Sequence, residues 1–389
     1  MKIDLSDADV VDAHCHPYRV EDLLARDPAA FETRCMFLGT ALLSSDHAAH
    51  DLAAFVEELT ETTAFGLALR RWLAAFLGCE PTKEAVVRAR DAALRADAVA
   101  YARRLLDNER VRAVIADEGY PQPTIPREEF ERALGGVRVH RVGRIEPWIL
   151  EAREAGSFDG TVGRFEQLVE EAAADPSLIA FKTIIAYRTG LDITDPPSSE
   201  AKAAYERWRA DGWNETREHA KPVRDFLFRR AIELAKRHER VFHVHVGGGD
   251  PDINLAHAKP RDVFPLLVEH QDLPIVLIHA GYPWLAEAAY VASVLPNVYL
   301  EISELVPWGW GQIDRGLELI LGAVPGAKVF HGSDEASEPE MFWASARLVR
   351  ASLERVLGSF VERDWLTKAE AERIGRGVLG DNARALHGV

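Results

Sequence analysis

Two histidines near the start of the chain, His14 and His16, close a short apolar run that begins at residue 10. On a β-strand, residues i and i+2 project from the same face, so both imidazoles can direct a lone pair at one cation. Such a pair supplies half of a metal site. Taken alone, the pair is equally consistent with two unrelated polar residues at a strand end, because short motifs often match by chance.

Three later apolar runs also end in potential metal ligands, at His245, His279 and Asp334. If these runs are parallel strands of one barrel, their carboxyl ends meet at a single mouth, and residues far apart in sequence come close together. We therefore predict a divalent-metal site. Its predicted ligands are His14, His16, His245 and Asp334. Three neutral nitrogens and one anionic oxygen suit Zn²⁺ first, with Mn²⁺ and Fe²⁺ as alternatives.

Eight short apolar runs rich in β-branched residues recur along the chain and are mostly separated by segments with helical spacing. They cover residues 9–14, 111–117, 139–146, 178–186, 241–246, 274–279, 297–303 and 328–333. Strands that alternate with helices predict an α/β fold with a parallel sheet, and eight of them favour a closed (β/α)8 TIM barrel. A doubly wound open sheet is disfavoured, because no glycine-rich phosphate turn follows the first run.

Two segments are longer than a simple βα unit requires. Residues 20–110 follow the first strand and carry recurrent apolar positions at helical spacing, which predicts a helical cap over the barrel mouth. Residues 189–222 form a smaller insertion after the fourth strand. We expect residues 1–389 to form a single barrel with these two insertions at its catalytic face.

Composition limits the classes of partner. The chain has 46 Lys and Arg against 62 Asp and Glu, a net charge of −16, and lacks a basic run, which argues against nucleic acid and anionic membranes. No signal-peptide pattern or membrane-spanning apolar stretch is present. The three cysteines lack the even count and spacing of a disulfide framework. We expect a cytoplasmic protein that acts on a small molecule, as a monomer or a homo-oligomer.

The combined pattern resembles the amidohydrolase superfamily, whose members are barrels with His-x-His on the first strand, His on the fifth and sixth, and Asp on the eighth. Residues 12–17, 181–191 and 296–301 narrow the resemblance. They look like the amidohydrolase-related barrel that some fungal and plant proteins carry fused to a glutamine synthetase domain. The resemblance covers essentially the whole chain.

The resemblance implies roles for individual residues. A divalent ion would lower the pKa of a coordinated water toward neutrality. Asp334 would accept the proton of that water and deliver it to a leaving nitrogen, and His279 would polarise the carbonyl. His243 shares the strand face of His245 and is expected to lie one layer deeper as a hydrogen-bonded core residue.

Lys182 has two readings. In binuclear members of the superfamily a fourth-strand lysine is carbamylated and bridges two metals, whereas the decarboxylase-related branch holds one metal without it. We favour an unmodified Lys182 that binds a substrate carboxylate or pairs with Glu146, because Tyr187 and Arg188 follow as further anion-binding groups. Glu146 and Trp148 are predicted to end the third strand on one face and to line the pocket.

These assignments predict a metal-dependent hydrolase that cleaves an amide or related C–N bond of a small carboxylate-bearing substrate. Two other reactions stay open: a non-oxidative decarboxylation, and a sugar-acid isomerisation of the uronate isomerase kind. A catalytically silent scaffold is disfavoured, since such a protein would have no chemical reason to keep all five ligand-type residues.

Overall fold

Eight parallel strands form the centre of the computed structural model, which describes residues 2–39 and 53–389. The strands are β1 (Val10–Cys15), β2 (Val111–Asp117), β3 (Arg138–Arg144), β4 (Leu178–Thr183), β5 (Val241–His245), β6 (Ile275–Ile278), β7 (Val298–Glu301) and β8 (Val329–Phe330). Each pairs in parallel with the next. The segment after β8 returns to β1, where the Ala13 amide donates to the His331 carbonyl across 2.8 Å. The predicted TIM barrel is confirmed.

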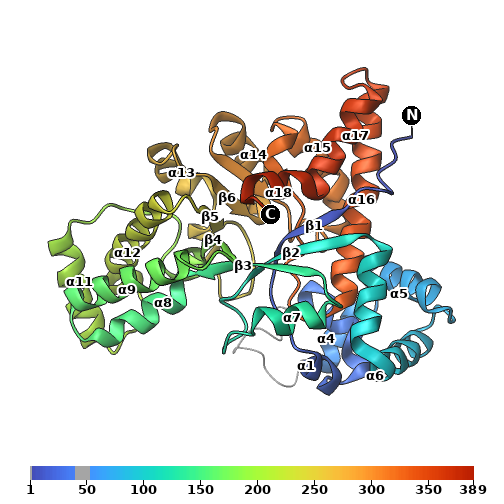
Figure 1. The fold of residues 1–389 in the computed structure, drawn as a ribbon, viewed down its shortest axis with the longest axis horizontal. Helices are drawn as coiled ribbons and strands as arrows, with labels where there is room; N and C mark the ends of the chain where they lie inside the picture. Colours follow the sequence, from blue (N-terminus) through green and yellow to red (C-terminus); the bar gives the residue numbers. More distant parts are fainter. Residues whose placement is uncertain (1, 40–52) are drawn as a thin grey trace.

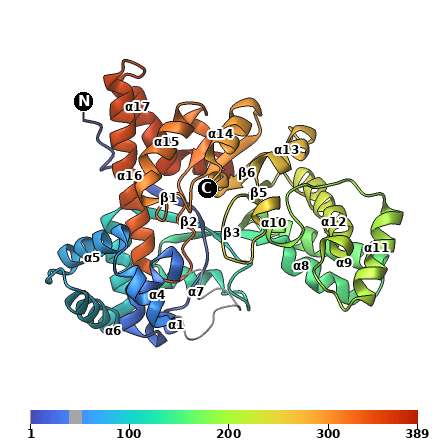
Figure 2. The same cartoon turned by 180° about the vertical axis from the view of Figure 1, so that it is seen from behind.

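Helices follow the strands and cover the outside of the barrel (Figures 1 and 2). The main ones are α7 (Arg127–Ala133), α9 (Phe158–Ala173), α12 (Arg217–Arg237), α13 (Pro260–Glu269), α14 (Leu285–Val294), α15 (Ile313–Leu321) and α16 (Pro339–Glu362). Side-chain caps determine where two of these helices begin. At α9, Ser157 Oγ accepts from the Gly160 amide, and at α12, Thr216 Oγ1 accepts from the His219 amide. None of the described helices has a stretch long and apolar enough to cross a bilayer.

The long segment after β1 is helical where the structure describes it. It contains α1 (Val20–Ala25), α2 (Phe31–Arg34), α4 (Ala53–Thr60), α5 (Ala64–Leu77) and α6 (Lys83–Asn108). Residues 40–52 of the predicted cap lie outside the described residues. Helix α6 contacts α16, and Arg90 in α6 pairs with Glu338 and Glu340 at the start of α16. This buried pairing connects the segment to the residues that follow β8.

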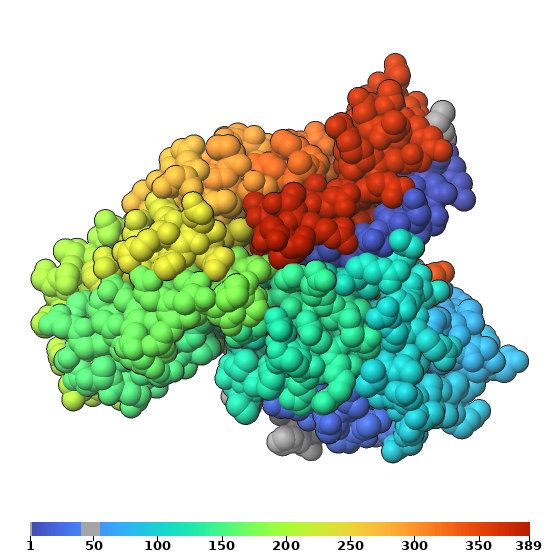
Figure 3. Space-filling model, viewed as in Figure 1, coloured from blue at the N-terminus to red at the C-terminus, as the bar shows by residue number. Residues whose placement is uncertain are grey.

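The second insertion lies at the opposite end of the molecule from α5 and α6 (Figure 3). It follows the short helix α10 (Ile185–Arg188) and contains α11 (Ser198–Ala210) and the start of α12. Trp208 of α11 is buried and packs edge-on against Trp213, with ring centroids 5.1 Å apart. Helix α11 packs on α9 and α12, so this insertion thickens the outer helical layer.

Several of the predicted strands end earlier than expected. The third ends at Arg144, because α8 (Ile145–Ala152) begins there, and the prediction that Glu146 and Trp148 end this strand was wrong. The Glu146 carboxylate accepts from Thr183 Oγ1 (2.6 Å) and from the Ile184 amide (2.9 Å). Tertiary contacts of this kind override the β-propensity of the residues past each strand end.

The lower part of the barrel is filled with side chains. The apolar ones come from all parts of the sheet and include Val11, Ile115, Val142, Ala180, Val276 and Phe330. His243 lies among them, and its Nε2 is 2.9 Å from Nε2 of His387 in α18 (Asn382–His387). His243 is therefore in hydrogen-bond contact below the barrel mouth, as predicted from its strand position.

Candidate metal centre

The two ends of the sequence meet at the barrel mouth. His14 Nε2 lies 3.0 Å from Asp334 Oδ1, and His16 Nε2 lies 3.4 Å from the same oxygen. The Asp334 amide also donates to the His14 carbonyl across 2.8 Å, so the backbone sets the two side chains side by side. Three predicted ligands thus converge on one point.

Two overlapping groups of ligand atoms satisfy the spacing of a metal site among residues 2–39 and 53–389. His14, His279 and Asp334 form one, and His14, His16 and Asp117 form the other, with the ligand atoms of each group within 4.8 Å of one another. Asp117 is the last residue of β2. It was not among the predicted ligands, although it ends an apolar run in the same manner as the histidines.

The protonation states fit a divalent cation. Burial lowers the pKa of His14 to about 4, with Lys182 adding to this shift and Asp334 opposing it. Burial alone would raise the pKa of Asp334, but His279, His14 and His16 outweigh it and hold that pKa well below its usual range. A neutral imidazole and an ionised carboxylate are the forms that bind metals, so neither His14 nor Asp334 must lose a proton at neutral pH.

His245 lies beside this group. Its Nδ1 is 3.0 Å from His279 Nε2, and its Nε2 is 2.7 Å from the Gly248 carbonyl oxygen. His279 Nδ1 in turn lies 2.8 Å from Ser303 Oγ. Neither ligand group above includes His245, so its role as a metal ligand stays a prediction.

Lys182 pairs with Asp117. Its Nζ lies 3.0 Å from Asp117 Oδ2 and 2.9 Å from His14 Nε2, and the predicted pairing with Glu146 was wrong. Arg144 Nη2 also donates to Asp117 Oδ2 across 2.6 Å. Burial lowers the pKa of Lys182, while Asp117 opposes that shift. One buried carboxylate therefore balances two cations directly beneath His14.

A cavity of about 630 Å³ opens above these groups. The predicted residues that line it are His16, Lys182, Tyr187, Arg188, His245, His279 and Asp334. Glu146 and Trp148 do not line it: Glu146 supports the end of β4, and the Trp148 ring packs on Phe181 at 5.9 Å. The segment after β1 contributes Arg26, Arg34 and Phe37 to the wall.

Tyr187 reaches the cavity because a glycine lies opposite it. Gly249 has φ 150°, and a β-carbon there would lie 1.8 Å from the Tyr187 hydroxyl oxygen. This oxygen accepts a hydrogen bond from the Asp250 amide across 2.9 Å. The Tyr187 ring also lies 4.7 Å from the His245 ring. The loop after β5 and helix α10 thereby hold each other in place at the mouth.

Three cavity residues adopt left-handed backbone conformations that are uncommon outside glycine. His279, Glu304 and Asp334 have φ values of 69°, 63° and 56°. Such a conformation costs roughly 1–2 kcal/mol per residue, and strain of this kind clusters at functional sites. His279 directly follows β6, whereas Glu304 and Asp334 lie a few residues beyond the ends of β7 and β8; at each position the backbone turns at the barrel mouth.

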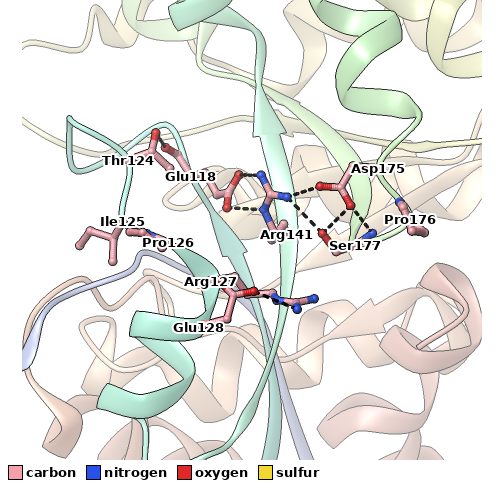
Figure 4. Close-up of a pocket in the computed structure, with 10 residues that line it drawn as sticks. All are labelled: Glu118, Thr124, Ile125, Pro126, Arg127, Glu128, Arg141, Asp175, Pro176 and Ser177. Carbon is pink, nitrogen blue, oxygen red and sulfur yellow. Dashed lines mark hydrogen bonds and ion pairs between the residues drawn. The ribbon is translucent and has the colours of Figure 1, made fainter.

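A second hollow of about 640 Å³ lies near Arg141 (Figure 4). Its central charge is satisfied internally, since Arg141 pairs with Glu118 on one side and Asp175 on the other. The ligand groups described above do not reach it. The cavity at the barrel mouth is therefore the candidate site.

Comparison with known proteins agrees with the geometry. The model of the family described as Amidohydrolase matches residues 11–389. The chain belongs to the amidohydrolase family. Family membership and the metal-type cluster indicate an enzyme with a metal-dependent hydrolase fold.

One curated relative and several solved structures are similar. Protein fluG of Emericella nidulans is 33% identical over 233 residues, which are 57% of this chain and 27% of that protein, so the match spans about a quarter of its length. A Lactobacillus casei protein provisionally described as a metal-dependent hydrolase has a TM-score of 0.82 at 22% identity, covering 100% of this chain and 98% of its own. Uronate isomerase of Thermotoga maritima has a TM-score of 0.67 at 16% identity, covering 98% and 95%. At these identities the solved structures show the shared fold alone.

Sequence reasoning missed several charged residues of the site, among them three at or beyond strand ends. Asp117 and Arg144 end β2 and β3, and Glu304 follows β7. A search for every charged residue at a strand end would have found the first two. Glu304 lies beyond its strand in an irregular segment, where strand spacing carries no information.

Proposed function

We propose that this protein is a metal-dependent hydrolase that cleaves an amide or related C–N bond in a small carboxylate-bearing substrate. The observation that carries the proposal is the convergence of His14 and His16 on Asp334 within 3.4 Å at the mouth of a barrel cavity. Amidohydrolase family membership supports the same reaction class.

The ligand atoms at the barrel mouth determine which metal ion would bind. His14, His16 and Asp334 would bind the ion, with His245 or His279 as a further ligand, and Zn²⁺ is the proposed metal. When bound, the ion supplies Lewis acidity that activates water at neutral pH. Asp334 is ionised, so it serves as the base that takes a proton from the attacking water and returns it to the departing nitrogen.

The other site residues orient the substrate. Lys182 has three ammonium donors, of which Asp117 and His14 take two, so one stays available for a substrate carboxylate. Arg188 and Tyr187 line the same cavity and add donors for that carboxylate. His279 is buried, and its Nδ1 contact with Ser303 orients the ring whose other nitrogen would polarise the scissile carbonyl.

The test is a mass-balanced assay of metal-loaded protein on amides of small mono- and dicarboxylic acids in ¹⁸O-labelled water. We expect product pairs that contain one added water, with the label in the new carboxylate, and turnover reduced by roughly two orders of magnitude or more in Asp334→Asn. Release of CO₂ without uptake of label would identify a decarboxylase. An isomeric product of unchanged mass would identify an isomerase. Either result would overturn the proposal.

A further inference from the structure

Glu304 is a buried acid that has no partner in the described part of the chain. It follows β7, lines the cavity and is 2% exposed. Its Oε2 is shut off from solvent without a hydrogen-bond partner, and no ion pair joins Glu304 to any cation in residues 2–39 and 53–389. A buried carboxyl group without a hydrogen-bond partner is costly, so this position calls for a ligand.

The surroundings of Glu304 are acidic. Burial raises the pKa of Glu304 well above its usual range, and the charges of Asp334 and Asp250 raise it further. This corner of the cavity therefore attracts a positive charge, which would remove the electrostatic cost of the buried carboxylate.

The cationic side chains of the cavity wall do not neutralise Glu304, because most of them already pair with other carboxylates. Lys182 and Arg144 share Asp117, and Arg34 Nε donates to Glu338 across 2.6 Å. Arg188 is the exception: it is exposed at the cavity and forms no ion pair with a described residue. The cavity thus carries two groups without a partner among residues 2–39 and 53–389, the buried carboxyl group of Glu304 and the exposed guanidinium of Arg188, which do not pair with each other.

We infer that Glu304 binds a protonated amine of the substrate while Arg188 binds its carboxylate, so that the enzyme acts on C–N bonds in zwitterionic amino acid derivatives. This inference rests on the hydrolase function proposed above and specifies its substrate class. It also accounts for the left-handed backbone at Glu304, φ 63°, which turns the side chain into the cavity.

An organic ammonium fits this corner better than a second metal ion. A hard cation such as Ca²⁺ needs six to eight oxygen ligands. Besides the carboxylates of Asp250 and Asp334, the cavity wall contains the rings of Tyr187 and Trp308, and Trp308 stacks on Phe37 with centroids 5.1 Å apart. Aromatic faces attract organic cations and supply no carboxylate oxygens.

The experiment measures binding by calorimetry on the metal-loaded protein at neutral pH. The probes are 4-aminobutanoate and 6-aminohexanoate, each compared with its amine-free counterpart, butanoate or hexanoate. We expect at least one amino acid to bind about tenfold or more tightly than its counterpart. Glu304→Gln should abolish this preference while leaving carboxylate affinity unchanged, and Arg188→Gln should weaken both members of the pair. Glu154→Gln, which removes a carboxylate from an exposed site, is the matched control and should retain the preference.

Equal binding of the paired probes, or binding of neither, would overturn the inference. Saturable binding of calcium chloride that disappears in Glu304→Gln would assign the carboxylate to a metal and would also overturn it. Different results would contradict the proposed hydrolase function. If the amine preference depends on Glu304 but no C–N bond is cleaved, the binding inference holds and the proposed reaction is wrong. If amides with and without an amine are cleaved equally well, the proposed reaction holds and the binding inference is wrong.

Discussion

Lys182 and Asp117 form a buried ion pair across 3.0 Å at the bottom of the candidate active site, with side chains that are 2% and 0% exposed. Asp117 also accepts from Arg144, so it keeps a cation when Lys182 is removed. The pair stands directly beneath His14, whose Nε2 is 2.9 Å from Nζ. This arrangement determines what loss of the lysine should do.

Lys182→Ala should leave metal content unchanged and mainly raise KM. The reason is that an unmodified lysine anchors the substrate carboxylate in the ground state and the transition state alike. Metal analysis and steady-state kinetics of the variant provide the check. Loss of metal together with activity, partly restored by added short-chain carboxylic acids, would instead show that Lys182 is carbamylated and bridges two ions.

Asp334→Asn should reduce turnover by roughly two orders of magnitude or more while the protein stays folded. The amide keeps the shape of the side chain but cannot accept the proton of the attacking water. Rate measurements on the metal-loaded variant, with circular dichroism to confirm folding, test this. Turnover equal to that of the wild type would remove Asp334 from the mechanism.

The purified protein should contain about one equivalent of a divalent transition metal. Prolonged chelation should remove the metal and the activity together and lower Tm, because an ion that binds only the folded state stabilises it. Elemental analysis, activity and thermal unfolding before and after chelation measure the three effects. A folded preparation that stays free of zinc, manganese and iron after supplementation would contradict the catalytic interpretation.

Arg90→Leu should destabilise the protein by roughly 3–5 kcal/mol, since it leaves the buried carboxylates of Glu338 and Glu340 without this cation. Denaturant unfolding measures the loss. The matched control is Arg95→Leu in the same helix, whose partner Asp91 lies in an exposed i, i+4 pair. The control should leave stability nearly unchanged, and an equal effect of both variants would mean that the buried network contributes nothing specific.

Stability should decline with acidification in part through His331. Burial lowers the pKa of His331 to about 3, so this side chain stays neutral in the folded state where the unfolded chain takes up a proton. Its contribution is present above pH 6.5 and is lost as the pH falls toward 3. His331→Leu should make the pH dependence shallower by about 1.4 kcal/mol per pH unit between pH 6 and 4. Unfolding curves across this range, with His257→Leu as the loop control, test the slope.

The sequence predicted the barrel well because each buried strand is a short apolar run, and runs of this kind are visible without a structure. It also located His14, His16, His279 and Asp334, because parallel strands bring their carboxyl ends to one mouth. The sequence did not predict the side-chain contacts between helices and strands. The pattern predicted Glu146 at the end of a strand, but Glu146 lies in helix α8. Its carboxylate accepts a hydrogen bond from the Ile184 amide just after β4. Nothing in the spacing indicated that Lys182 would face Asp117 rather than Glu146.

The contact between His14 and Asp334 has a consequence for how the protein folds. The ligand set joins β1 to the residues after β8, so it cannot form until the last strand has docked on the first. Pairings between segments so distant in sequence form late, because the entropy of closing the intervening chain must be lost first. Metal uptake during refolding should therefore lag behind the recovery of helical signal, and a bound ion would mark the molecules in which the barrel has closed.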